Sequence, residues 1–137
     1  MSDRRLVLAS AVLGLVGAGI AAYLTYAHYS KSAIACPTSG CETVQSSSYA
    51  EIAGIPVALL GLVGYLVILV GLVLPREVGR TVVLAASTAG SVFSLYLLAV
   101  QAFEIHAFCV WCITSDLIVL AIAGLSLAAF WIAEPEA

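Results

Sequence analysis

The chain has 137 residues, of which 63% are hydrophobic and only 9% are charged. A water-soluble domain needs far more polar surface than this, so the composition indicates an integral membrane protein. The formal net charge of −3 is small and dispersed, which argues against a nucleic-acid-binding surface.

At about 20 apolar residues per crossing, the chain has room for about four spanning helices with short connections. The first apolar segment, about 6–27, follows Arg4 and Arg5 and is longer than the apolar part of a cleaved leader. A polar loop of about residues 30–54 comes next. Within it, the mixed apolar and polar residues 44–52 predict a short interfacial helix.

Three further apolar segments follow, at about 55–74, 81–105 and 113–132. Pro56 suits the start of the second segment, because its missing N–H costs nothing at a helix start. The expected fold is therefore an all-α bundle of four transmembrane helices. It forms a single membrane domain over residues 1–137, with no soluble domain left over.

Basic residues predict the orientation of these helices. Arg4 and Arg5 precede the first helix, and Arg76 and Arg80 separate the second from the third, whereas only Lys31 lies on the other side. By the positive-inside rule, both termini are cytoplasmic and the 30–54 loop is extracytoplasmic. The sequence thus predicts a multi-pass protein of the cell membrane.

Four cysteines form two closely spaced pairs, and this topology brings both pairs to the outer face. Cys36 and Cys41 lie in the polar loop, and Cys109 and Cys112 form a C-x-x-C at the head of the fourth helix. The unpaired N–H groups of a helix start stabilise a thiolate. A disulfide closing so small a ring stabilises little, which favours a redox role for the second pair.

Several alternatives remain open for these cysteines. The Cys36–Cys41 pair is either a staple within the loop or a shuttle that passes electrons to Cys109. Four thiolates could also hold zinc, although an oxidising exterior would compete for them. A third class of function is a non-catalytic membrane subunit with structural disulfides.

A dithiol at a membrane edge, without a haem ligand pair or a dinucleotide-binding loop, points to a lipid-soluble electron acceptor, most simply a quinone. Such a site is apolar and aromatic with a few polar anchors. Phe108 and Trp111 are candidate walls beside Cys112, and Ser47 is a candidate anchor. Each has a plain alternative, as bundle packing or as a loop cap.

Two stripes of small residues at i, i+3, i+4, i+7 spacing predict close helix packing. Their members are Gly14, Gly17, Ala18 and Ala21 in the first helix, and Ser87, Gly90, Ser91 and Ser94 in the third. A polar path along the serines is the weaker interpretation. Asp116 lies a turn into the fourth helix, where a carboxylate is costly, and is a candidate for proton delivery.

Taken together, Cys36-x-x-x-x-Cys41, Ser47, the Gly54-Ile55-Pro56 helix entry and Cys109-Val110-Trp111-Cys112 resemble the vitamin K epoxide reductase family. The likeness covers essentially the whole chain and is nearest to the bacterial and archaeal homologues. It implies a four-helix bundle around a quinone of the menaquinone, ubiquinone or vitamin K type.

The resemblance also implies roles for the cysteines. Cys109 and Cys112 would be the active-site pair, with Cys112 nearest the quinone. Cys36 and Cys41 would be the relay pair, exchanging disulfides with a separate thioredoxin-like extracytoplasmic protein. Ser47 matches the family's loop serine near the quinone head group.

There is one departure beside the C-x-x-C, and another in the second helix. Asp116 stands where the animal enzymes have a tyrosine, and their second-helix asparagine has no clear match. We therefore expect a quinone-dependent thiol–disulfide oxidoreductase that drives disulfide formation. Reduction of vitamin K epoxide is an alternative activity.

Overall fold

The computed structural model describes residues 2–30, 51–52, 54–105 and 110–133. Within these ranges the chain is almost entirely helical, with one small pair of strands. The elements are, in chain order, α1 (Ser2–Ser30), β1 (Glu51–Ile52), β2 (Ile55–Pro56), α3 (Val57–Val73), α4 (Arg76–Val100), the π-helical turn η2 (Gln101–Ile105) and α5 (Val110–Ala133).

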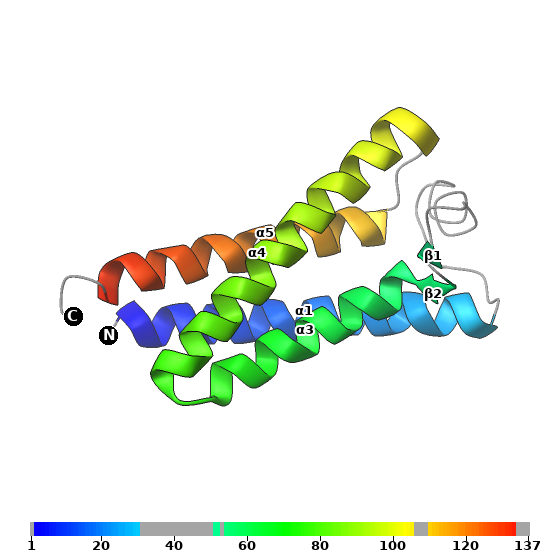
Figure 1. Cartoon of the computed structure of the whole chain (residues 1–137). Helices are drawn as coiled ribbons and strands as arrows, with labels where there is room; N and C mark the ends of the chain where they lie inside the picture. The colour runs from blue at the N-terminus through cyan, green and yellow to red at the C-terminus, as the bar shows by residue number, and fades with distance from the viewer. Residues whose placement is uncertain (1, 31–50, 53, 106–109, 134–137) are drawn as a thin grey trace.

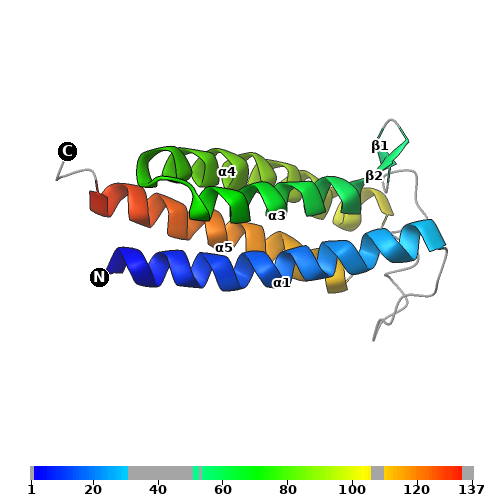
Figure 2. The same ribbon diagram turned by 90° about the horizontal axis from the view of Figure 1, so that it is seen from below.

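The four long helices pack as a bundle in which α1 contacts α3 and α5, and α4 contacts the same two helices. The described ends of α1 and α5 nearest the two termini lie at one end of the bundle, together with the α3–α4 turn (Figures 1 and 2). The strand pair and the start of α5 lie at the other end. Helix α4 crosses the bundle obliquely, and η2 extends beyond the start of α5.

Three helices of the described part are long and apolar enough to cross a membrane, namely those over Arg4–Tyr29, Glu77–Glu104 and Val110–Ala129. Val57–Val73 forms a shorter apolar helix. The expectation of a helical membrane bundle is thus confirmed in its helix content and hydropathy.

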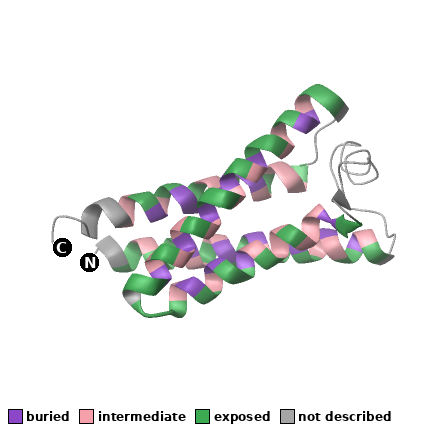
Figure 3. Cartoon of the chain, viewed as in Figure 1, coloured by how far each residue is buried: buried purple, intermediate pink, exposed green. Residues whose placement is uncertain are grey.

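Small residues let the helices approach closely, as their spacing predicts. An added Cβ at Gly17 would overlap the ring of Tyr65 on α3, and one at Gly90 would lie 3.0 Å from Val119 on α5. The hydroxyl of Ser91 donates a 3.5 Å hydrogen bond to the carbonyl of Val119. Buried residues therefore follow the lines where helices meet (Figure 3).

The entry to the second helix differs from the sequence expectation. Residues 51–52 form a strand and not the end of an interfacial helix, whereas residues 44–50 lie outside the described part. Glu51 pairs with Pro56 and Ile52 with Ile55 in antiparallel register. Gly54 turns the chain with φ of +82°, a conformation that favours glycine. Helix α3 therefore begins at Val57, two residues later than expected.

Helix α4 begins earlier than expected, at Arg76 in place of about residue 81. Pro75 precedes it as the N-cap, and Glu77 in the first turn complements the positive end of the helix. The polar residues of this turn thus serve as a helix start and not as a linker. The last five residues of the expected helix, Gln101–Ile105, are π-helical.

Candidate functional site

Most of the predicted site residues lie outside the described part of the chain. These are Cys36, Cys41, Ser47, Phe108 and Cys109, so their mutual geometry stays a prediction. Trp111 and Cys112 fall in the first turn of α5, which begins at Val110. The helix start expected at the C-x-x-C is thus present on the Cys112 side.

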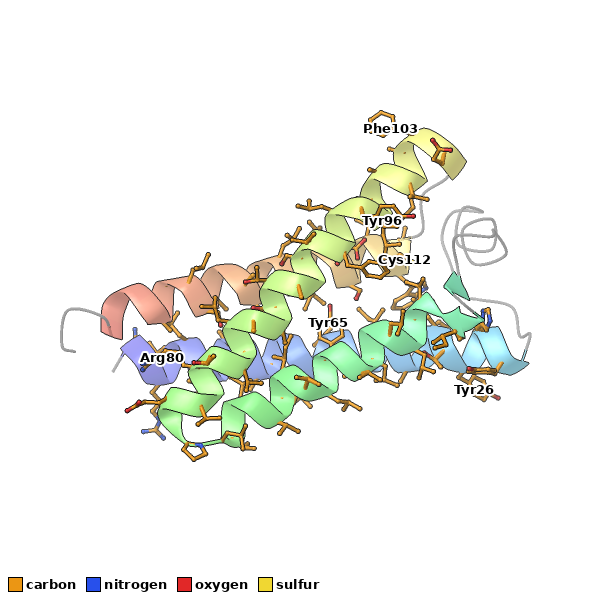
Figure 4. All side chains as sticks on the ribbon, in the orientation of Figure 1. Tyr26, Tyr65, Arg80, Tyr96, Phe103 and Cys112 are labelled. Atoms are coloured by element: carbon orange, nitrogen blue, oxygen red, sulfur yellow. The ribbon has the colours of Figure 1, made fainter. Side chains whose placement is uncertain are left out.

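A cavity of about 170 Å³ lies beside Cys112, between α3, α4 and α5, with two residues of α1 at its edge. Most of its wall is apolar. Its polar lining consists of Tyr65 from α3, Ser94 and Gln101 from the α4–η2 segment, and Cys112, Ser115 and Asp116 from α5. Figure 4 shows the labelled Tyr65 and Cys112 side chains in this region of the bundle.

Helix periodicity explains why α5 contributes so many polar groups to the cavity. Cys112, Ser115, Asp116 and Val119 all line it and follow i, i+3, i+4, i+7 spacing, so they occupy one face of the helix. The half-buried Cys112 thiol is therefore one turn away from the Asp116 carboxyl group.

Tyr65 ties α3 to α5 next to the cavity. Its hydroxyl donates a 2.6 Å hydrogen bond to the carbonyl oxygen of Ser115 and lies 2.9 Å from the Ser115 hydroxyl. The side chain is only 4% exposed. Because its hydroxyl is hydrogen-bonded and the side chain is buried, Tyr65 forms a fixed part of the cavity wall.

Asp116 is the acidic group of the cavity, and it is only 5% exposed. The Ser94 hydroxyl donates a hydrogen bond to its carboxylate. The oxygen Oδ2 is buried and has no hydrogen-bond partner among the described residues. Gln101, 2% exposed, brings an amide to the same cavity.

Trp111 lies beside Cys112 and packs toward α1. Its ring centroid is 5.4 Å from that of Tyr23, at an interplanar angle of 58°. This contact fixes the first turn of α5 against α1 and thereby helps to position Cys112.

A second cavity, of about 300 Å³, lies in the half of the bundle that contains the α3–α4 turn. Arg80, Ser10 and Ser126 supply polar groups to its otherwise mostly apolar lining. None of its described lining residues is a cysteine, whereas Cys112 lines the first cavity.

The described residues contain no group of three or more histidine, cysteine or acidic side chains that could hold a metal ion. The zinc hypothesis requires all four cysteines, and three of them lie outside the described part. The structure therefore leaves that hypothesis untested.

Sequence reasoning picked out Cys112 and Asp116 but missed Tyr65 and Gln101. It assigned Ser94 to helix packing, whereas Ser94 lines the cavity and binds Asp116. Tyr65 and Gln101 are polar side chains within or at the end of apolar segments, and that was the available indication.

A comparison with protein families gives one match of direct bearing. The family model described as the vitamin K epoxide reductase family matches residues 8–127. This range includes the whole of α3 and α4, most of α1 and α5, and every described residue that lines the cavity beside Cys112.

Proposed function

This chain belongs to the vitamin K epoxide reductase family, and from that premise we propose that it is a quinone-dependent thiol–disulfide oxidoreductase of the cell membrane. Membership of the family implies a membrane oxidoreductase whose chemistry concerns disulfides. The acceptor, the partner and the order of the cysteines are parts of the proposal.

The position of Cys112 in the wall of a mostly apolar cavity is the observation that carries the proposal. An engineered apolar cavity of about 150 Å³ holds benzene, so a volume near 170 Å³ suits a single six-membered ring. A few convergent polar groups in an apolar pocket are typical of cofactor and substrate sites. A quinone head group has this size and polarity.

The basic residues support the proposed orientation. Arg80 lies at the end of the bundle where the described chain ends lie (Figures 1 and 4), and Arg4 and Arg5 lie in the first turn of α1 at that same end. Cys112 lies toward the opposite end. With the positive end cytoplasmic, the thiol faces the extracytoplasmic side of a multi-pass protein.

Four crossings fit the helix lengths. The shortest helix, α3, has 17 residues, which corresponds to about 26 Å at 1.5 Å per residue. The hydrocarbon core is about 30 Å thick, and 17 residues is the lower limit for a spanning helix. The strand pair that precedes α3 would then lie at the outer interface.

In the proposed reaction, a reduced dithiol of a separate thioredoxin-like extracytoplasmic protein reduces the Cys36–Cys41 disulfide and is itself oxidised. The relay pair then reduces Cys109–Cys112. The quinone accepts two electrons and two protons, and the Cys109–Cys112 disulfide re-forms. The net result is one new disulfide in the partner and one hydroquinone.

The remaining site residues have supporting roles in this proposal. Ser47 and Phe108 would contact the quinone head group, together with Cys112. Trp111 would contribute from the first turn of α5, where its contact with Tyr23 holds that turn in place.

The test uses the purified full chain in detergent with a reduced thioredoxin-like dithiol and a short-chain quinone, followed by quinone absorbance. We expect turnover in the native protein and none in Cys112→Ser. Leu117→Ala is the matched control, because Leu117 lies on α5 five residues after Cys112 and is 57% exposed.

Two results would contradict the proposal. One is equal turnover in Cys112→Ser. The other is an absence of turnover with benzoquinone-type and naphthoquinone-type acceptors alike, together with disulfides that resist mild reductant, which would favour a structural subunit. Consumption of vitamin K epoxide in a parallel assay would add the alternative activity.

A further inference from the structure

We propose that Asp116 is the catalytic acid of the cavity, which delivers a proton to a carbonyl oxygen of the quinone. This inference rests on the proposed function, since it assigns a residue to the reduction of a quinone beside Cys112. It goes beyond that function because it names the source of the proton inside the bundle.

The first observation is the incomplete hydrogen bonding of the carboxyl group. Ser94 binds the group, and Oδ2 has no partner among the described residues, although Asp116 is only 5% exposed. A buried polar atom left unsatisfied costs about 1–3 kcal/mol, and a charged one costs more. Such a group in a cavity wall is poised to bind a ligand atom.

The second observation is the position of Asp116 along the helix. It lies six residues after Val110, where α5 begins, which is about 9 Å along the axis. The favourable field of a helix N-terminus acts mainly within the first turn. The helix start therefore does not explain why a carboxyl group is buried here.

The third observation is the relation between Asp116 and Cys112. Both line the same cavity, and residues at i and i+4 on a helix have Cβ atoms about 5–6 Å apart. A six-membered ring in the cavity would therefore meet the sulfur and the carboxyl group together. The group that donates electrons and the group that donates a proton are thus adjacent.

The count of electrons and protons in the reduction of the quinone shows where each proton comes from. The Cys109–Cys112 dithiol loses two electrons and two protons as its disulfide forms, and the quinone gains both pairs to become hydroquinone. Asp116 takes the proton of the Cys112 thiol, transfers it to a ring oxygen and returns to its starting state. The second proton comes from the Cys109 thiol, so no other reductant or acid is required.

The other described groups that line the cavity are less suited than Asp116 to donate a proton. The Tyr65 hydroxyl on α3 is already bound to Ser115, the α4–η2 segment contributes the neutral Ser94 and Gln101, and α1 contributes only the apolar Ala21 and Leu24. Among the described residues that line the cavity, none is a lysine, arginine, histidine or second carboxylate. Cys112 and Tyr65 are the other titratable groups among those described lining residues.

The decisive variant is Asp116→Asn in the full chain, because asparagine keeps the shape and can still accept a hydrogen bond from Ser94. We expect kcat for quinone reduction to fall by about 100-fold, the lower end for loss of a general acid. The KM for quinone should change far less. The part of the pH dependence of kcat that is due to ionisation of Asp116 should disappear.

Stability provides a readout that separates this role from a structural one. Asparagine buries no charge, so the thermal midpoint of Asp116→Asn should equal or exceed that of the native protein. If Asp116 were needed only for packing, activity and midpoint would fall together. Asp116→Glu, which keeps a proton donor, should recover part of kcat.

Glu104→Gln is the matched control, since Glu104 is an exposed carboxylate in η2 and does not line the cavity. Turnover of Asp116→Asn within about threefold of the native rate would overturn the inference, while native turnover would leave the proposed function standing. An inactive native protein would overturn the proposed function itself. The two failures are therefore distinguishable.

Discussion

Replacement of Gly17 by alanine tests the packing that positions the cavity wall. A Cβ at this position would overlap the Tyr65 ring. The ring cannot move aside freely, because Tyr65 is 4% exposed and its hydroxyl is bonded to Ser115. The added methyl group must therefore displace the ring or separate α1 from α3.

The expected cost follows from three contributions. Overpacking a close contact costs about 1–3 kcal/mol, and loss of the Tyr65 hydrogen bond adds about 0.5–1.5 kcal/mol. Alanine offsets about 1 kcal/mol of this because it favours helix more than glycine. We expect a net loss of about 2 kcal/mol in the free energy of unfolding.

The measurement is the thermal unfolding midpoint in detergent, with Gly19→Ala as control. Gly19 lies two residues away on α1, and an added Cβ there meets no atom within 4 Å. Gly19→Ala should be neutral or slightly stabilising, whereas Gly17→Ala should unfold at a lower temperature. In a Tyr65→Ala background, Gly17→Ala should cause no further loss. Equal midpoints for the two glycine variants would refute the reasoning.

Two further variants test other contacts. Tyr65→Phe removes the hydroxyl that joins α3 to α5 and should cost about 1 kcal/mol, seen as a lower thermal midpoint; an unchanged midpoint would mean that this bond adds nothing to stability. Gly79→Ala places a Cβ on α4 against the backbone oxygen of Gly71 on α3 and should destabilise by about 1–3 kcal/mol. Its control is Gly124→Ala, where an added Cβ meets nothing within 4 Å. Equal thermal midpoints for the two variants would contradict a close contact at Gly79.

The sequence predicted the helices well, because length and hydropathy specify a spanning segment directly. At Gly17 and Ser91 the small-residue stripes pack as predicted, since i, i+4 spacing fixes which positions share a face, whereas Ser94 lines the cavity. Ile52 and Ile55 were placed less well, as their strand pairing depends on contacts between residues and not on helical period. The wall of the cavity was the least predictable part. Helix α3 is apolar on nearly all sides, so its hydrophobic pattern did not show which way Tyr65 faces, and the polar hydroxyl of Tyr65 was the one indication.

The position of Leu60 bears on how the rate of quinone reduction should depend on lipid or detergent. It lines the cavity from α3 and is also 39% exposed. A ligand that arrives past such a side chain comes from the hydrocarbon phase, where the lipid and not the buffer is its solvent. The mole fraction of the quinone among lipids or detergent molecules then governs saturation of the cavity. Adding empty micelles at constant total quinone should lower the rate, and rates for this protein should be compared on a per-lipid scale.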